Sequence, residues 1–103
     1  MKFVNLTPHA INEKISGQTF APSGSVARVA TGKEYRGDFE GIPTYRTTYG
    51  KVVGLPQPQD GVVYIVSGMV LAAISGRNDV FAPGELVRDE NGNPIGCEGF
   101  KVN

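Results

Sequence analysis

Apolar and polar positions alternate along most of this chain in short runs, a spacing that predicts strands. Lys2 to Leu6, His9 to Ile15 and Ser25 to Thr31 each form an extended run bounded by Pro, Gly or Ser. Ile42 to Val53 mixes Tyr, Thr and Val, which is typical of a strand because aromatic and β-branched side chains fit a pleated surface. Gly50 is the expected position of a bulge in that strand.

One part of the pattern predicts a helix instead. Val62 to Val66 is an apolar, mostly β-branched run of the kind found in a buried central strand. A Ser-Gly pair follows it, and Met69 to Ile74 is apolar throughout. With Ser67 as the N-cap and Gly76 just past the last turn, we expect one short helix near residues 67–75.

Polar or proline-rich segments connect these runs. Gly32 to Gly41 is the most polar stretch and predicts an exposed hairpin or loop. Leu55 to Gly61 contains two prolines, which remove backbone donors, and predicts a surface connection. Leu86 to Cys97 holds an Asn-Gly pair between apolar residues, the signal of a β-hairpin.

Composition favours the same fold class. Fourteen Gly and seven Pro among 103 residues supply many turns and suit short strands better than long helices. The length fits a single domain over residues 1–103 with one core. We therefore expect a mainly β (α+β) domain, a small compact antiparallel sheet or a partly open barrel with one short helix.

Charge and cysteine content narrow the classes of function. Ten basic and ten acidic residues cancel, so no net positive charge is available to drive general nucleic-acid binding. Cys97 is the only cysteine, which excludes an intrachain disulfide and fits a reducing compartment. The first residues build no apolar signal segment, and Val62 to Ile74 is too short and interrupted to span a bilayer. We expect a cytoplasmic protein that does not associate with membranes.

The main candidate for ligand contact follows the predicted helix. Arg77, Asn78 and Asp79 place a guanidinium, an amide and a carboxylate side by side. These groups can bind a phosphate, a base edge and a ribose hydroxyl, and Phe81 is near enough in sequence to stack on a base. The alternative is an Asx turn in which Asp79 binds backbone amides and pairs with Arg77 at the surface.

Further candidates come from other parts of the chain. Ser67 and Gly68 lead from a strand into a helix N-terminus, where free N–H groups can hold a phosphate, although an ordinary capped helix explains the same residues. Arg28 lies in a small, apolar segment and needs an anion, either a ligand phosphate or an acidic side chain. Thr7 and His9 flank a proline whose bend can present both side chains.

His9 also limits the chemistry, because it is the only histidine. Acid–base catalysis or a His-rich metal site would need a carboxylate or a second His9 from another subunit. A His9 that binds the backbone at the bend is the structural alternative, and Cys97 is expected to be a buried, inert thiol. Neither the Walker A nor the Rossmann glycine pattern occurs, and we expect no cofactor and no metal.

Several motifs carry a resemblance to a known group of proteins. They are Asn5 to Ala10 (Asn-Leu-Thr-Pro-His-Ala), Gly76 to Gly84 (Gly-Arg-Asn-Asp-Val-Phe-Ala-Pro-Gly), and Val87-Arg88-Asp89 leading to Gly96-Cys97. In these motifs the chain resembles small uncharacterised proteins of tailed bacteriophages and prophages, over nearly its whole length. Small accessory phage proteins often counter host defence, and one recurring strategy is to sequester the nucleotide signals that defence systems produce.

The resemblance, together with the residues, leads to a functional hypothesis. The protein is expected to bind a cyclic oligonucleotide or an ADP-ribose derivative in the host cytoplasm without cleaving it. Because a small domain gains pocket walls by symmetric assembly, we expect a homo-oligomer with ligand sites near its interfaces. The expected ligand-binding residues are Thr7, His9, Arg28, Ser67, Gly68, Arg77, Asn78, Asp79 and Phe81.

Two alternatives belong to other classes of function. The first is an enzyme that cleaves such a signal through His9, which product formation would reveal. The second is a structural or host-protein-binding phage accessory that uses Pro56 to Gln59 and Gly32 to Gly41 as contact surfaces. Recovery of a host protein together with indifference to small ligands would favour the second.

Overall fold

The structure, a computed structural model, describes all residues from Met1 to Asn103. With 53% of residues in strands and 5% in a helix, it confirms the predicted mainly β fold with one short helix. In chain order the elements are β1 (Lys2–Asn5), β2 (Ile11–Asn12), β3 (Thr19–Phe20), β4 (Arg28–Phe39), β5 (Ile42–Val53), β6 (Val62–Ile65), α1 (Gly68–Ala72), β7 (Val80–Arg88) and β8 (Pro94–Lys101).

A four-stranded sheet in the order β1-β6-β7-β8 forms the body of the protein. The expected antiparallel pairing holds for β7–β8 and for the two-stranded sheets β2–β3 and β4–β5. It is wrong for β1–β6 and β6–β7, which are parallel because the chain crosses over between those strands. The sheets do not close, so the alternative of a partly open barrel is also wrong.

The strand β6 lies at the centre of the core and was correctly predicted as buried. Its side chains alternate between the two faces of the sheet, as the pleat requires. Tyr64, and Val66 directly after the strand, join the main cluster with Leu6, Val70 and Val80. Ile65 joins Ile11 and Cys97 on the other face. Both faces of this short strand are therefore covered.

The helix α1 is shorter than the predicted span of residues 67–75. Ser67 is its N-cap, as expected, because the Ser67 side chain accepts a hydrogen bond from the Val70 N–H at 3.2 Å. The helix ends at Ala72 with Ala73 as its C-cap, so Gly76 lies beyond it. The carbonyls of Leu71 and Ile74 accept bonds from the Asn103 side chain at 2.8 and 2.7 Å. No helix of the structure combines the length and apolar character needed to cross a membrane.

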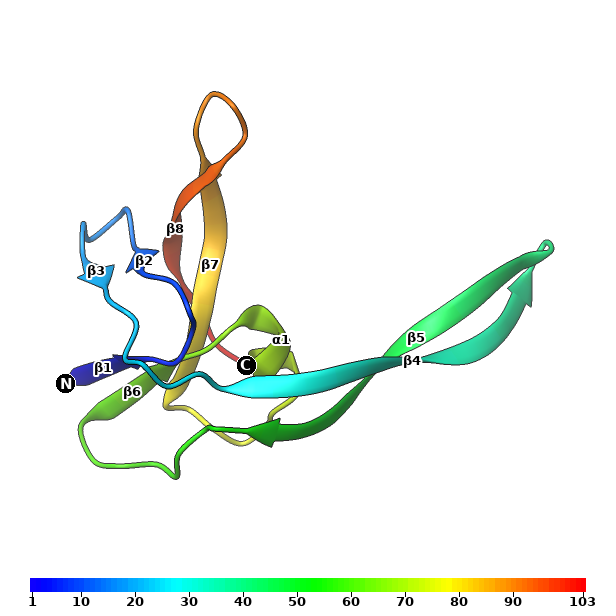
Figure 1. Cartoon of the computed structure of the whole chain (residues 1–103), viewed down its shortest axis with the longest axis horizontal. Coiled ribbons are helices and arrows are strands. Elements are labelled where there is room, and N and C mark those ends of the chain that lie inside the picture. The colour runs from blue at the N-terminus through cyan, green and yellow to red at the C-terminus, as the bar shows by residue number, and fades with distance from the viewer.

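Two hairpins project from the body in different directions (Figure 1). The longer one, β4–β5, contacts the core only near its base, through the partly buried Val29 and Val52. The radius of gyration is 16.1 Å, against about 13 Å for a compact chain of this size. The expected compact shape is therefore wrong.

The strand boundaries correct several expectations. The predicted strand Ser25 to Thr31 begins only at Arg28 and runs on to Phe39. The polar Gly32 to Gly41 segment lies in the exposed β4–β5 hairpin, one of the two forms predicted for it. The prediction for Ile42 to Val53 is confirmed, and the bulge lies at Gly50 and Lys51, opposite one β4 residue. Of the predicted run His9 to Ile15, only Ile11 and Asn12 form a strand, because the rest turns toward β3.

A buried carboxylate, Glu13, joins the β2–β3 turn to β8. One oxygen of Glu13 accepts from the Ile15 and Gly99 amides at 2.9 and 2.8 Å, and the other accepts from the Ser16 amide at 2.6 Å. Hydrogen bonding with Ser16, then with Gly99 and Ile15, lowers the pKa of Glu13 to about 2 from its ordinary value of 4.5. The folded state therefore favours the ionised form.

The stability of the protein is expected to fall at acid pH through Glu13. Because its folded pKa is depressed, the contribution of Glu13 is complete above about pH 4.5 and is lost as the pH falls toward 2. Glu13→Gln should lower the unfolding temperature at pH 7 and flatten the decline between pH 5 and about pH 2.5. Glu90→Gln, on an exposed side chain in the β7–β8 turn, serves as the control. Equal pH profiles for Glu13→Gln and wild type would contradict the role of Glu13.

Candidate functional site

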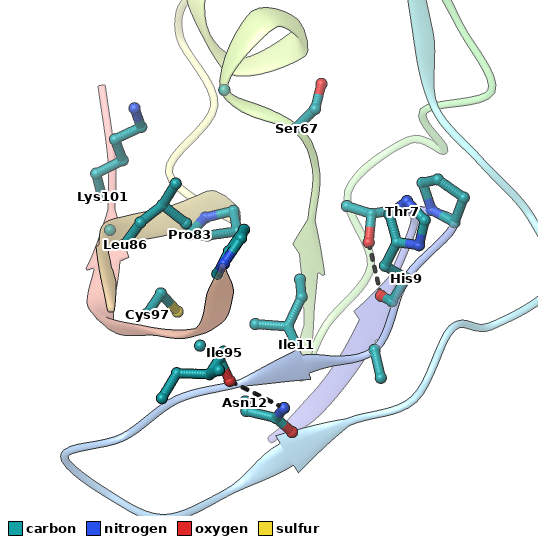
Figure 2. A pocket seen from close by; sticks show the side chains of 16 residues that line it. Thr7, His9, Ile11, Asn12, Ser67, Pro83, Leu86, Ile95, Cys97 and Lys101 are labelled. Carbon is teal, nitrogen blue, oxygen red and sulfur yellow. Dashed lines mark hydrogen bonds between the residues drawn. The ribbon is translucent and has the colours of Figure 1, made fainter. Parts of the chain in front are cut away.

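A hollow of about 740 Å³ opens between the loop before β2, the start of α1 and the β7–β8 hairpin (Figure 2). This volume lies within the range of small-molecule sites. Figure 2 shows that Lys101, Ser67 and the loop with Thr7 and His9 approach the hollow from different sides. Its lining is Thr7, Pro8, His9, Ala10, Ile11, Asn12, Ser67, Gly68, Pro83, Gly84, Leu86, Pro94, Ile95, Gly96, Cys97 and Lys101.

The loop that forms one wall is shaped by Asn5, the last residue of β1. The Asn5 amide nitrogen donates to the carbonyls of His9 and Phe20 at 2.8 and 3.0 Å. Its oxygen accepts from the Thr7 N–H at 2.9 Å and the Thr7 hydroxyl at 2.7 Å. The Asn-Leu-Thr-Pro-His motif is thus a closed loop in which Thr7 is a positioning residue and the His9 ring is exposed.

Close packing of β2 against β8 forms the floor of the hollow. Asn12 donates to the Ile95 carbonyl at 3.3 Å, and Gly96 lies directly beside Asn12. A Cβ at Gly96 would lie 2.6 Å from the Asn12 carbonyl oxygen, so no side chain fits at this position. Glycine at residue 96 is therefore what lets these strands meet and bring Ile95 to the site.

The lining is apolar over much of its surface and carries little charge. Ile11, Leu86, Ile95 and three prolines supply the apolar walls. Lys101 is the one residue in the lining with a permanent charge at neutral pH, and no carboxylate is among the lining residues. A Cβ at Gly68 would lie 3.4 Å from the Lys101 ammonium nitrogen, which places this cation beside the start of α1. The lining suits a ligand with a flat apolar part and an anionic group.

The Arg77, Asn78 and Asp79 segment lies away from this hollow. Arg77 donates to both Asp79 carboxylate oxygens at 2.8 and 2.9 Å and to the Pro56 carbonyl at 3.0 Å. Their mutual hydrogen bonds raise the pKa of Arg77 and lower that of Asp79. This ion pair holds the proline-rich connection against the start of β7, while Arg77 and Asn78 line a separate hollow of about 570 Å³.

Two other predicted residues also lie outside the hollow. Arg28 is exposed at the start of β4 and makes no ion pair. The Phe81 ring lies 6.1 Å from the Phe100 ring, and Phe100 in turn packs against Phe20 at 5.5 Å. The structure therefore brings together Thr7, His9, Ser67 and Gly68, and it separates them from the remaining predicted residues.

Sequence reasoning missed several residues of the site. Lys101, Leu86 and Ile95 reach the hollow only because β8 folds back along β7, and no local motif marks them. Burial raises the pKa of the Cys97 thiol, consistent with the inert thiol that was expected. No group of three or more His, Cys, Asp or Glu side chains is arranged to hold a metal ion.

Replacement of Asn5 should destabilise the protein and disorder the wall of the hollow. In Asn5→Ala the Thr7 N–H and the His9 and Phe20 carbonyls lose their partner. We expect a loss of about 3 kcal/mol in the free energy of unfolding, measured by urea denaturation. The exposed Asn78→Ala should stay within about 0.5 kcal/mol of wild type, and equal losses in the two variants would argue against the role of Asn5.

Comparisons of the chain with protein-family models, with curated proteins and with solved structures found no match. The resemblance to tailed-phage proteins therefore stays a prediction. What this protein binds has to be inferred from the shape and chemistry of the hollow.

Proposed function

We propose that this protein binds and sequesters a small nucleotide-type ligand, a cyclic oligonucleotide or an ADP-ribose derivative, in the hollow between the Thr7–Asn12 loop, the Ser67-Gly68 turn and β7–β8. The observation that carries the proposal is the combination of apolar walls with one ammonium group and no carboxylate in a hollow of about 740 Å³. Nucleotides present the matching chemistry, since a base offers flat apolar faces and its phosphates carry negative charge.

Individual lining residues fit parts of such a ligand. Leu86 and Ile95 are half-exposed aliphatic side chains on which a base can pack, and the His9 ring can stack on its other face. Lys101 can bind a phosphate as a point charge. The Ser67 oxygen accepts from the Val70 N–H, which leaves the hydroxyl proton for a ligand oxygen.

The lining favours binding over catalysis. General acid–base chemistry needs a positioned proton donor and acceptor within reach of the reacting group. His9 is the only imidazole in the chain, and no Asp or Glu lines the hollow to orient it. The alternative of cleavage through His9 would require a second group from another copy of the chain.

The resemblance to tailed-phage proteins suggests the biological context. A protein that binds a host immune signal tightly and leaves it intact lowers the free concentration of that signal. A phage-encoded sponge acting in the host cytoplasm is therefore the role that we propose.

Thermal unfolding with a ligand panel tests the proposal. The panel consists of cyclic dinucleotides, cyclic trinucleotides and ADP-ribose derivatives, and ligand released from the complex is identified by chromatography. A ligand at 100 times its Kd should add about 2.7 kcal/mol of stability, a rise of several degrees. Intact ligand is the expected recovery. Converted ligand would support an enzyme instead, and no shift across the panel would refute nucleotide binding.

Matched variants locate the site. Lys101→Ala should weaken binding about tenfold or more, because one charge-assisted contact with phosphate is lost. Arg77→Ala removes a cation outside the hollow and should leave the affinity unchanged while lowering stability by about 2 kcal/mol. Titration calorimetry measures both. If Arg77→Ala lost binding and Lys101→Ala kept it, the ligand site would lie at the Arg77–Asp79 segment instead of the hollow.

A further inference from the structure

The hairpin from Arg28 to Val53, termed the arm, projects from the body (Figure 1) and concentrates positive charge. Residues 28–36 and 46–53 of the arm contain five of the ten basic side chains of the protein and one of its ten acidic ones. These residues have a formal net charge of +4, and the rest of the chain has −4. The zero net charge that argued against nucleic-acid binding is therefore an average over two oppositely charged regions.

Two unpaired cations mark one face of the arm near its base. Side chains along a strand alternate between the two faces of a sheet, and Val29 and Val52 pack against the core. Arg28 and Lys51 directly precede these valines in the sequence, so both point to the face that is turned away from the core. Both are exposed, and neither forms an ion pair within the chain.

An ion cluster continues this face toward the tip. Glu34 lies six positions after Arg28 on the same strand, so the two side chains share a face. The two carboxylate oxygens of Glu34 accept from Arg36 and Arg46, each at 3.1 Å. One carboxylate between two half-exposed guanidiniums orders both of them and leaves a net positive charge in solvent. The basic face is defined as Arg28, Glu34, Arg36, Arg46 and Lys51.

The centre of the basic face is flat, because the residues between the cations are small. A Cβ at Gly50 would lie 3.5 Å from the Ala30 Cβ, and a Cβ at Gly32 would lie 3.1 Å from the Thr48 hydroxyl oxygen. These four positions therefore belong to the same face. With two glycines and an alanine in its middle, the face lets a partner approach the backbone of the arm closely.

The aromatic side chains lie on the opposite face of the arm. Tyr35 and Tyr45 have ring centroids 5.9 Å apart, and the Lys33 ammonium lies 4.5 Å from the Tyr45 centroid. The Tyr35 hydroxyl donates to Asp38 at 2.8 Å, which keeps that carboxylate on the tyrosine side. Proteins bind single-stranded nucleic acid by stacking bases on aromatic rings beside cations. The basic face has no ring, so it fits a duplex, whose bases stay stacked.

The dimensions of the basic face match those of a DNA groove. From Arg28 to Glu34 the face extends for about 20 Å along the arm. The major groove of B-DNA is about 12 Å wide and admits a two-stranded β-ribbon. Phosphates border the groove on both sides, and the cations come from both strands of the arm, Arg28 and Arg36 from β4 and Arg46 and Lys51 from β5.

We infer that the arm binds double-stranded DNA through its basic face, with the four cations on phosphates and the small central residues toward the groove. Contacts with phosphates carry no sequence information, so this binding is independent of sequence. An RNA duplex fits less well, because its major groove is deep and narrow. The inference is separate from the proposed ligand site, since no residue of the basic face lines the hollow.

Fluorescence anisotropy of a short labelled DNA duplex at increasing salt tests this inference. The logarithm of the association constant should fall with the logarithm of the salt concentration with a slope of about −3, because three to four phosphates are neutralised. Arg28→Ala with Lys51→Ala should weaken binding at least tenfold at low salt and make the slope shallower by about 2. Lys2→Ala with Lys14→Ala removes the same charge from exposed positions outside the arm and should change the affinity less than twofold.

Further variants separate the two faces of the arm. Tyr35→Ser with Tyr45→Ser should leave duplex binding unchanged, and the wild type should bind a DNA single strand and an RNA duplex more weakly than the DNA duplex. If Arg28→Ala with Lys51→Ala misfolds by circular dichroism, Arg36→Gln with Arg46→Gln replaces it, with the same expected loss. A wild type that does not bind the duplex at the lowest salt, equal losses in the Lys2 and Lys14 control, or loss only in the tyrosine variant would overturn the inference.

Discussion

The buried amide of Asn5 is the interaction on which the N-terminal half of the body depends. Its side chain ties the Thr7–His9 loop to β3, and its own carbonyl accepts bonds from the backbone and side chain of Ser23 at 3.0 and 2.7 Å. Strands β2 and β3 have only 2 residues each, too few to hold a segment by backbone pairing alone. The Asn5 side chain therefore supplies the attachment that longer strands would supply by backbone pairing. Both N–H donors and the oxygen of its amide are hydrogen-bonded.

Glu13 has the same function at the other end of this segment. It binds backbone amides of its own turn and of Gly99, across 86 positions of sequence. Asn5 and Glu13 together fix the loop and β2 against β8, and residues of the loop, β2 and β8 line the hollow. Polar contacts thus hold this segment at both ends, while Ile11 packs against Ile65 and Cys97 between them. The Glu13 contacts link the shape of the wall to the ionisation of a single carboxylate.

The remaining charged groups divide into those already paired and those directed outward. Arg77 is engaged by Asp79 and a carbonyl, so its role is to anchor a connection. Lys101 has no such partner and stands at the hollow. The β4–β5 hairpin exposes apolar side chains at its tip, where Phe39 and Ile42 are 68% and 63% exposed.

The sequence by itself determined the features that depend on neighbouring residues. The strand from Ile42 to Val53 with its bulge at Gly50, the buried β6, the Ser67 cap and the C-terminal hairpin all follow from local propensity and turn chemistry. The bend at Pro8 was also expected to present Thr7 and His9, and both residues line the hollow. Only the tertiary structure decided the parallel pairing, the projection of the β4–β5 hairpin, the pairing of Arg77 and the position of Lys101 at the hollow. Each of these results from contacts between residues distant in sequence, where chain crossover and packing outweigh any local signal.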